Sequence, residues 1–136
     1  MWSYFRIYLV LILLVPNVYA SDSCLNYQAE VTLQGRLVLR TFFGPPNYGE
    51  NPETDVRETQ AIVLLERPVC VLGNAASYDA EEKDQMDVTL VPLPGSNLSD
   101  FAGRRVLVKG TLFHAHTGHH HTQLLMSVNH IEWQDK

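Results

Sequence analysis

Hydrophobic and polar residues alternate along several stretches of this chain with the period of two that is typical of β-strands. Residues 27–43 form the first such stretch, and Gly35 inside it indicates a bulge or a sharp bend. Residues 61–72 form an apolar run, in which Pro68 is expected at an edge or a kink because it has no N–H to donate. Both stretches therefore predict strands.

Three further strands are predicted, one over residues 86–93 and two over the arms of a hairpin at 106–131. Between them, residues 97–103 predict a single helical turn, capped by Ser96 or Asn97. Five strands with a short helix before the last two predict a mostly β fold. We expect a small OB-like barrel, with a small β-sandwich as the alternative.

Two polar segments separate these strands. Residues 43–60 contain Gly and Pro turn signals and predict a loop, in which Tyr48 is expected to pack against its surroundings. Residues 78–87 carry five acidic side chains around Lys83, without the ligand alternation and central glycine of a calcium loop. This segment predicts a solvated connection.

The first twenty residues are expected to be a secretory signal peptide. Arg6 is their single charge, residues 7–15 form a short apolar core, and Ala20 ends a segment suited to cleavage. Residues 21–136 then form a single domain, periplasmic or secreted, that meets a membrane only through the signal peptide. The net charge of -5 argues against nucleic acid as a partner.

Cys24 and Cys70 are the only cysteines, and both lie in the part of the chain expected to be exported. In an oxidising compartment such a pair most simply forms a disulfide. We therefore expect a bond that joins the new N-terminus to the strand over 61–72.

Five of the six histidines crowd the tip of the predicted hairpin. They are His114, His116, His119, His120 and His121. A two-residue turn at 117–118 would pair His116 with His119, and glycine at its second position favours that register. A three-residue loop would pair Leu112 with Leu124 and place the apolar residues of both arms on one side. We favour this second register because burial involves more free energy than one turn preference.

Either register gathers at least three histidines, with His114 and His116 common to both. Imidazole nitrogens bind divalent transition metals, so we expect a metal site, with zinc first and copper or nickel as alternatives. The acidic residues of 79–87 are candidates for a fourth ligand or a supporting carboxylate. The competing interpretations are a solvated or stacking loop and a pH-sensitive contact. His130 stands apart and is expected to be a packed or surface histidine.

The histidine segment, Phe113-His-Ala-His-Thr-Gly-His-His-His-Thr122, stands in a chain that also contains three other distinctive stretches. These are residues 24–27, 43–48 and 68–71. Together they resemble a family of small exported bacterial proteins catalogued only as a domain of unknown function, over nearly the whole mature chain. The resemblance implies an exported, one-domain protein and assigns no activity.

The favoured function is therefore an exported metal-binding module rather than an enzyme. One alternative is an inhibitor or immunity-type protein, which would block a toxin or hydrolase with the histidine hairpin and so have a protein partner. Another is a small hydrolase with a metal-bound water, for which Glu66 and Asp87 are the candidate bases.

Overall fold

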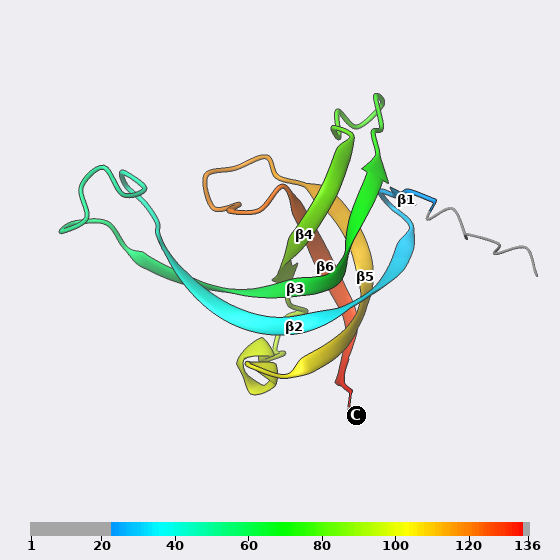
Figure 1. Ribbon diagram of the computed structural model, residues 1–136. Coiled ribbons are helices and arrows are strands. Elements are labelled where there is room, and N and C mark those ends of the chain that lie inside the picture. The colour runs from blue at the N-terminus through cyan, green and yellow to red at the C-terminus, as the bar shows by residue number, and fades with distance from the viewer. Residues whose placement is uncertain (1–22, 135–136) are drawn as a thin grey trace, which may run out of the picture.

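The computed structural model describes residues 23–134, so the predicted signal peptide lies outside the described part. The described chain is mostly β, as predicted, and has six strands and one 3-10 turn (Figure 1). The elements are β1 (Leu25–Asn26), β2 (Glu30–Phe43), β3 (Arg57–Leu72), β4 (Glu82–Val91), η1 (Leu98–Phe101), β5 (Arg105–His114) and β6 (Leu124–Trp133). Residues 23–134 contain no helix long and apolar enough to cross a membrane.

The strands form one sheet in the order β1-β3-β2-β5-β6-β4, and β3 also pairs with β4. Each of the five long strands therefore has a strand on both sides along part of its length. The β1–β3 and β4–β6 pairs are parallel, and the others are antiparallel. The sixth strand, which the sequence analysis did not predict, is the two-residue β1 at the start of the described chain.

The core consists of side chains that alternate to one face of each strand. Val31, Leu33 and Leu37 supply it from β2, and Leu37 is fully buried. The other strands contribute in the same way, and most of these side chains are Val, Leu or Met. Leu98 of η1 also enters the core, and the side chain of Asn97 caps this turn by accepting a hydrogen bond from Ser99 N–H at 3.1 Å. The predicted helical turn is thus confirmed.

Gly35 is the residue at which β2 is shared between two neighbours. It lies opposite Leu65 of β3 and Val106 of β5, and neither ladder shifts register there. A Cβ atom at this position would overlap the carbonyl oxygen of Leu64. Glycine is therefore needed for a close approach of two backbones, and not for the bulge that was one of its predicted roles.

Two segment boundaries differ from the prediction. The segment predicted as a loop ends earlier, because β3 already begins at Arg57. The acidic segment is also shorter than expected, because β4 begins at Glu82 and pairs with β3 at Val71. In both places the first residues of the strand are polar, so they lack the alternation of hydrophobic and polar residues from which the strands were predicted. Pro68 lies where the β3–β4 register shifts, as expected for a residue without an N–H.

The register of the β5–β6 hairpin differs from both predicted registers. Leu112 lies opposite Met126 and His114 opposite Leu124, two positions beyond the favoured pairing. Because side chains alternate with a period of two, an even shift leaves the same residues facing the core. A further shift after Lys109 places Val106 opposite Trp133. The predicted burial of the two arms is confirmed, and the predicted pairing is wrong.

Cys24 and Cys70 form the predicted disulfide, with their Cα atoms 4.7 Å apart. The bond closes a loop with a sequence separation of 46 residues and lies beside the parallel pairing of Leu25 with Val71. Closing a loop of this length reduces the entropy of the unfolded chain, which corresponds to about 4 kcal/mol of stabilisation in the chain-entropy treatment.

Reduction of this disulfide is expected to lower the melting temperature by at least several degrees, because the unfolded chain regains the entropy of the open loop. Thermal denaturation followed by circular dichroism, with and without reductant, measures the effect. The Cys24→Ser/Cys70→Ser variant is the control: reductant should leave its melting temperature unchanged. An equal melting temperature for the oxidised and reduced protein would contradict the expected role of the bond.

Replacement of Gly35 by Ala should destabilise the fold by about 1–3 kcal/mol, because the added methyl group meets a backbone carbonyl that cannot move independently. Urea denaturation gives the free energy of unfolding. Gly95→Ala is the comparison, since its φ of 84° is unfavourable for alanine but no atom lies within 4 Å of the added carbon. A smaller loss at Gly35 than at Gly95 would show that the close approach is unimportant.

Candidate functional site

The five clustered histidines lie in and beside the loop between β5 and β6, residues 115–123, here called the histidine loop. Ala115 N–H donates to the carbonyl of Gln123 at 3.0 Å and continues the ladder by one step before the chain leaves it. The loop is therefore longer than either predicted turn. Its histidines are not opposed across two strands, and their positions depend on what the loop contacts.

The histidine loop lies against the outer ends of β2 and β3, residues 38–43 and 57–60, here called the arm. The His121 ring stacks on Phe42 with ring centroids 3.9 Å apart and an interplanar angle of 5°. Gln60 donates from its side-chain amide to the carbonyl of His119 at 2.7 Å. Phe42 lies opposite Glu58, and Gln60 is two residues further along β3. These side chains therefore share one face of the arm, and the loop covers it.

His119 also contacts the arm through its side chain. Its Nδ1 lies 2.8 and 3.0 Å from the two carboxylate oxygens of Glu58. A carboxylate accepts hydrogen bonds only, so Nδ1 carries the proton and, in the neutral ring, Nε2 has the lone pair. Tyr48 approaches Nε2 with its hydroxyl at 3.4 Å, and its ring lies so near Gly118 that a Cβ atom there would be 3.1 Å from it. The predicted packing role of Tyr48 is seen in this contact.

Tyr48 is positioned by the loop over residues 44–56, which folds around the carboxylate of Asp55. This carboxylate is buried and accepts backbone hydrogen bonds from Asn47 at 2.8 Å and Gly49 at 2.7 Å. Burial alone would raise the pKa of Asp55, but the hydrogen bonds from Gly49 and Asn47 outweigh it and lower the pKa. The ionised form therefore stabilises the turn, in which Tyr48 has a φ of 51°.

His116 and His120 form a second contact, with ring centroids 4.6 Å apart and planes at 82°. His116 donates from Nδ1 to the carbonyl of His114 at 3.0 Å, so its Nε2 has the lone pair in the neutral ring. His120 Nδ1 accepts from the backbone N–H of His116 at 3.0 Å. Partial burial lowers the pKa of His120, and the neighbouring rings of His116, His119 and His121 lower it further. His120 is therefore neutral at pH 7.

His114 is turned away from the loop towards β4. Its Nε2 lies 2.8 Å from a carboxylate oxygen of Glu82, and its Nδ1 lies 2.9 Å from the carbonyl of Ala115. Both side chains of the pair are 19% exposed. Two acceptors face the two ring nitrogens, and only the imidazolium form donates to both. Glu82 belongs to the acidic segment, whose residues were candidates for a fourth ligand or a supporting carboxylate.

Tyr27 completes the surroundings of Glu82. Its hydroxyl donates to the carbonyl of Ala80 at 2.7 Å, and its ring meets that of His114 edge to face at 6.5 Å. Burial raises the pKa of Tyr27 to about 12, with further contributions from the negative charges of Glu82 and Asp79. The phenol therefore stays neutral beside the His114–Glu82 pair at any physiological pH.

The structure thus divides the predicted ligands between three places. His116, His119 and His120 lie on the loop, His114 pairs with β4, and His121 stacks on the arm with its Nε2 buried and without a hydrogen-bond partner. Within residues 23–134, no group of three or more His, Cys, Asp and Glu side chains has an arrangement that could hold a metal ion. His130 is 57% exposed, as expected, and faces Lys109 on β5.

Glu58 is the residue at this site that the sequence analysis missed. It was included in the predicted loop because residues 57–60 are all polar and give no strand signal. Only the pairing of Phe42 with Glu58 across the arm brings its carboxylate to the histidine loop. The available signal was the length of the first predicted strand. A strand over residues 27–43 needs a partner that is longer than residues 61–72, and extending that partner towards the N-terminus would have included Glu58.

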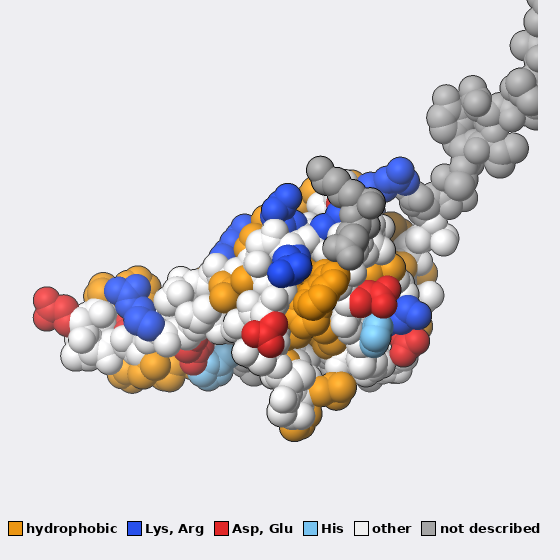
Figure 2. Space-filling model, turned by 90° about the horizontal axis from the view of Figure 1, so that it is seen from below, with side chains coloured by type: hydrophobic (Ala, Val, Ile, Leu, Met, Phe, Trp, Pro, Cys, Tyr) orange, Lys and Arg blue, Asp and Glu red, His pale blue; other side chains and the backbone are white. Residues whose placement is uncertain are grey.

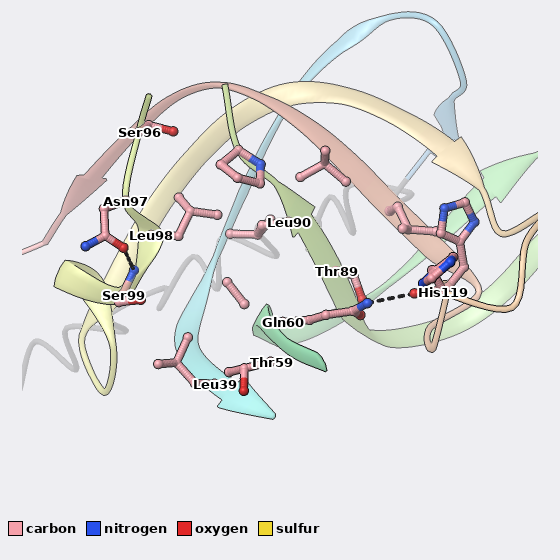
Figure 3. Close-up of a pocket in the computed structure, with 15 residues that line it drawn as sticks. Leu39, Thr59, Gln60, Thr89, Leu90, Ser96, Asn97, Leu98, Ser99 and His119 are labelled. Carbon is pink, nitrogen blue, oxygen red and sulfur yellow. Dashed lines mark hydrogen bonds between the residues drawn. The ribbon is translucent and has the colours of Figure 1, made fainter. Parts of the chain in front are cut away.

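A groove of about 480 Å³ opens beside His119 and His120 (Figure 3). Its apolar lining is Leu39, Ala61, Leu90, Val91, Pro92, Leu98 and Leu125, and its polar lining is Thr59, Gln60, Thr89, Ser96, Asn97 and Ser99. Figure 3 shows Gln60 bonded to His119 at one end and Asn97 bonded to Ser99 at the other. Among residues 23–134, no Lys, Arg, Asp or Glu lines the groove. A ligand there would be held by hydroxyl, amide and imidazole groups.

Comparison with known proteins returned one family. Neither the curated proteins nor the solved structures gave a match to the chain. A family model matches residues 85–132, which run from β4 to β6 and include the whole histidine loop. This match confirms the resemblance expected from the histidine motif, over a shorter part of the chain than expected. The segment that carries the histidine loop, without the arm residues that contact it, is therefore similar to the family described as "Domain of unknown function (DUF4431)".

Proposed function

We propose that this protein is an exported OB-like β-barrel module that binds a divalent transition metal, most favourably zinc, through its histidine loop. The barrel is supported by the strand pairings, which run from β3 through β2, β5, β6 and β4 and return to β3. A short turn before the last two strands also agrees with an OB-like fold. Export is supported by the Cys24–Cys70 disulfide, since such bonds persist in oxidising compartments.

The contact between His119 and Glu58 is the observation that carries the metal-binding proposal. A histidine that binds a metal usually donates its other N–H to a carboxylate or a backbone carbonyl, which sets the tautomer and orients the ring. His119 does this with Glu58, and His116 does it with the carbonyl of His114. Both rings therefore present Nε2 in the form that a metal ion requires.

The proposed ligands are the Nε2 atoms of His116 and His119, with His120 as the third ligand through its Nδ1. This nitrogen now accepts the His116 N–H, so binding requires that hydrogen bond to be released. His116 and His120 already contact each other, whereas His119 lies on the arm side of the loop. Binding requires the loop to bring these rings together, and Gly118 gives it backbone freedom between them. His114 and His121 are left outside the proposed set, because one pairs with Glu82 and the other stacks on Phe42.

Three neutral imidazoles would leave one position of a tetrahedral zinc ion open to water or to a ligand. The groove beside His119 and His120 gives such a ligand a place to bind. Glu58 lies next to His119 but already accepts its N–H, so it is not free to act as a general base. The residues therefore support a binding role better than a hydrolytic one.

Mature protein purified from periplasm without a histidine tag is expected to contain, or to take up, about one zinc ion per chain. The His116→Ala/His119→Ala variant should bind at least about 100-fold more weakly, because two of the three ligands are lost. Elemental analysis and calorimetric titration measure these quantities, and competition with copper and nickel ranks the metals.

His130→Ala is the control for that experiment, because His130 is exposed and remote from the loop in the sheet. It should bind zinc as the wild type does. The proposal would be refuted by wild-type protein that takes up no metal at neutral pH, or by undiminished binding in the double variant.

Glu58→Gln is expected to weaken zinc binding about 10- to 100-fold while leaving the fold intact, because it removes the carboxylate that orients His119. Glu82→Gln is the matched control, since it makes the same change next to His114, outside the proposed set. Calorimetric titration of both variants compares the two carboxylates. A larger loss in Glu82→Gln than in Glu58→Gln would move the site to His114.

A further inference from the structure

The arm leaves one edge of β2 without a strand neighbour. β2 pairs with β5 only as far as Arg36, while its pairing with β3 continues to Phe43. Leu37 makes the last backbone contacts on the β5 side, donating to Arg104 at 3.0 Å and accepting from Gly103 at 2.8 Å. Beyond it, residues 38–43 have a strand on one side only within the described chain. Figure 1 shows this part of β2 running along the outside of the molecule.

The direction of the backbone groups on this edge follows from two hydrogen bonds. Leu37 N–H points towards Arg104, away from β3, whereas Gly44 N–H donates to Val56 at the far end of the arm. Backbone groups alternate along a strand, so even-numbered residues bond to β3. The N–H and C=O groups of Leu39, Thr41 and Phe43 therefore face outwards from the open edge.

This edge has little of the usual protection against pairing with another strand, since Arg40 is its one charged side chain. Natural proteins protect exposed edges with proline, lysine, bulges or covering segments. Residues 38–43 contain neither proline nor lysine, and the β2–β3 register does not shift along them. Leu39 is 41% exposed and Thr41 is exposed. Figure 2 shows the arm from below, projecting away from the body of the molecule.

We propose that a second copy of this chain binds along this edge, with its own β2 antiparallel and a two-fold axis at Thr41. In this register Thr41 faces Thr41, Leu39 faces Phe43, and Arg40 faces Phe42 of the other copy. Each of the outward-facing residues then exchanges backbone hydrogen bonds with its opposite. Leu39 comes opposite Phe43 on one face, where Arg57 of the same copy lies 3.7 Å over the Phe43 ring. On the other face Arg40, which lies 3.5 Å from Asp87 of its own copy, comes next to the ring of Phe42.

The side chains select this register over its neighbours. A shift of the axis to Arg40 would place two arginines directly opposite each other, which is unfavourable. A shift to Phe42 leaves Leu39 without an opposite strand residue, because β2 ends at Phe43. Only the axis at Thr41 uses the edge from Leu39 to Phe43 without opposing like charges. This match of side chains across the axis favours a second copy of the chain over a strand from another protein.

The contact is small, and we expect it to be weaker than the interfaces of stable complexes, which typically bury roughly 1,200–2,000 Å². Association should therefore be reversible and concentration-dependent. Sedimentation velocity on the full mature protein, from about 10 µM to about 1 mM, is expected to show a monomer that converts to a dimer.

Charge substitution at Thr41 tests the proposed axis. Thr41→Lys and Thr41→Glu should each remain monomeric, because the two-fold axis places each new charge opposite itself. An equimolar mixture of the two variants should dimerise again, since lysine then faces glutamate. This recovery is expected only where residue 41 of one copy lies beside residue 41 of the other.

Thr59→Lys is the matched control. Thr59 lies directly opposite Thr41 in the arm, and their hydroxyl oxygens are 2.8 Å apart, so both variants lose the same hydroxyl pair. Its backbone faces the other edge of the arm, and its dimerisation should equal that of the wild type. The proposal would be overturned by a wild type that stays monomeric throughout, by equal loss in Thr59→Lys, or by a mixture that does not associate. Circular dichroism confirms that each variant is folded.

Discussion

The sharing of β2 between two neighbours at Gly35 is the constraint on which the rest of the structure depends. At this residue the backbones of β2 and β3 come too close for any side chain, and β2 has β5 on its other edge. On the N-terminal side of this point β2 pairs with β5, and on the C-terminal side it pairs with β3. The outer halves of β2 and β3 therefore leave the body of the sheet as a two-stranded arm. This arm is the surface on which the histidine loop packs.

The candidate site is built from segments that are far apart in the sequence. β2 supplies Phe42, β3 supplies Glu58 and Gln60, and the loop after β5 supplies the histidines that meet them. The three contacts differ in kind. The His121 ring stacks on Phe42, the backbone carbonyl of His119 accepts from Gln60, and the His119 ring donates its N–H to Glu58. The loop is thus held on the arm by several separate contacts.

Much of the fold could be predicted, because the hydrophobic alternation specifies which face of a strand is buried. The β5–β6 pairing shows both the strength and the limit of that signal. Leu112, Leu124 and Met126 face the core as predicted, although the pairing is displaced by two residues, because any even displacement buries the same side chains. The sequence pattern determines the parity of a register but not its value.

The site was less predictable for the same reason. Its histidines lie in a loop, where no alternation exists, and their partners Glu58 and Glu82 lie in polar strand ends that were assigned to connections. Cysteine pairing was predictable because two cysteines allow one bond. The contacts of five histidines with several carboxylates allow many arrangements, and only the three-dimensional pairing of the arm selects among them.

The position of the disulfide has a consequence for handling the protein. Cys24 and Cys70 lie at one end of the 16-residue strand β3, whereas the arm and the loop residues that contact it, His119 and His121, lie at the other end. A linker or label attached next to Cys24 would therefore be joined to the end of β3 that is remote from the arm and its open edge. The protein can therefore be immobilised from its N-terminal side with the arm directed into solution.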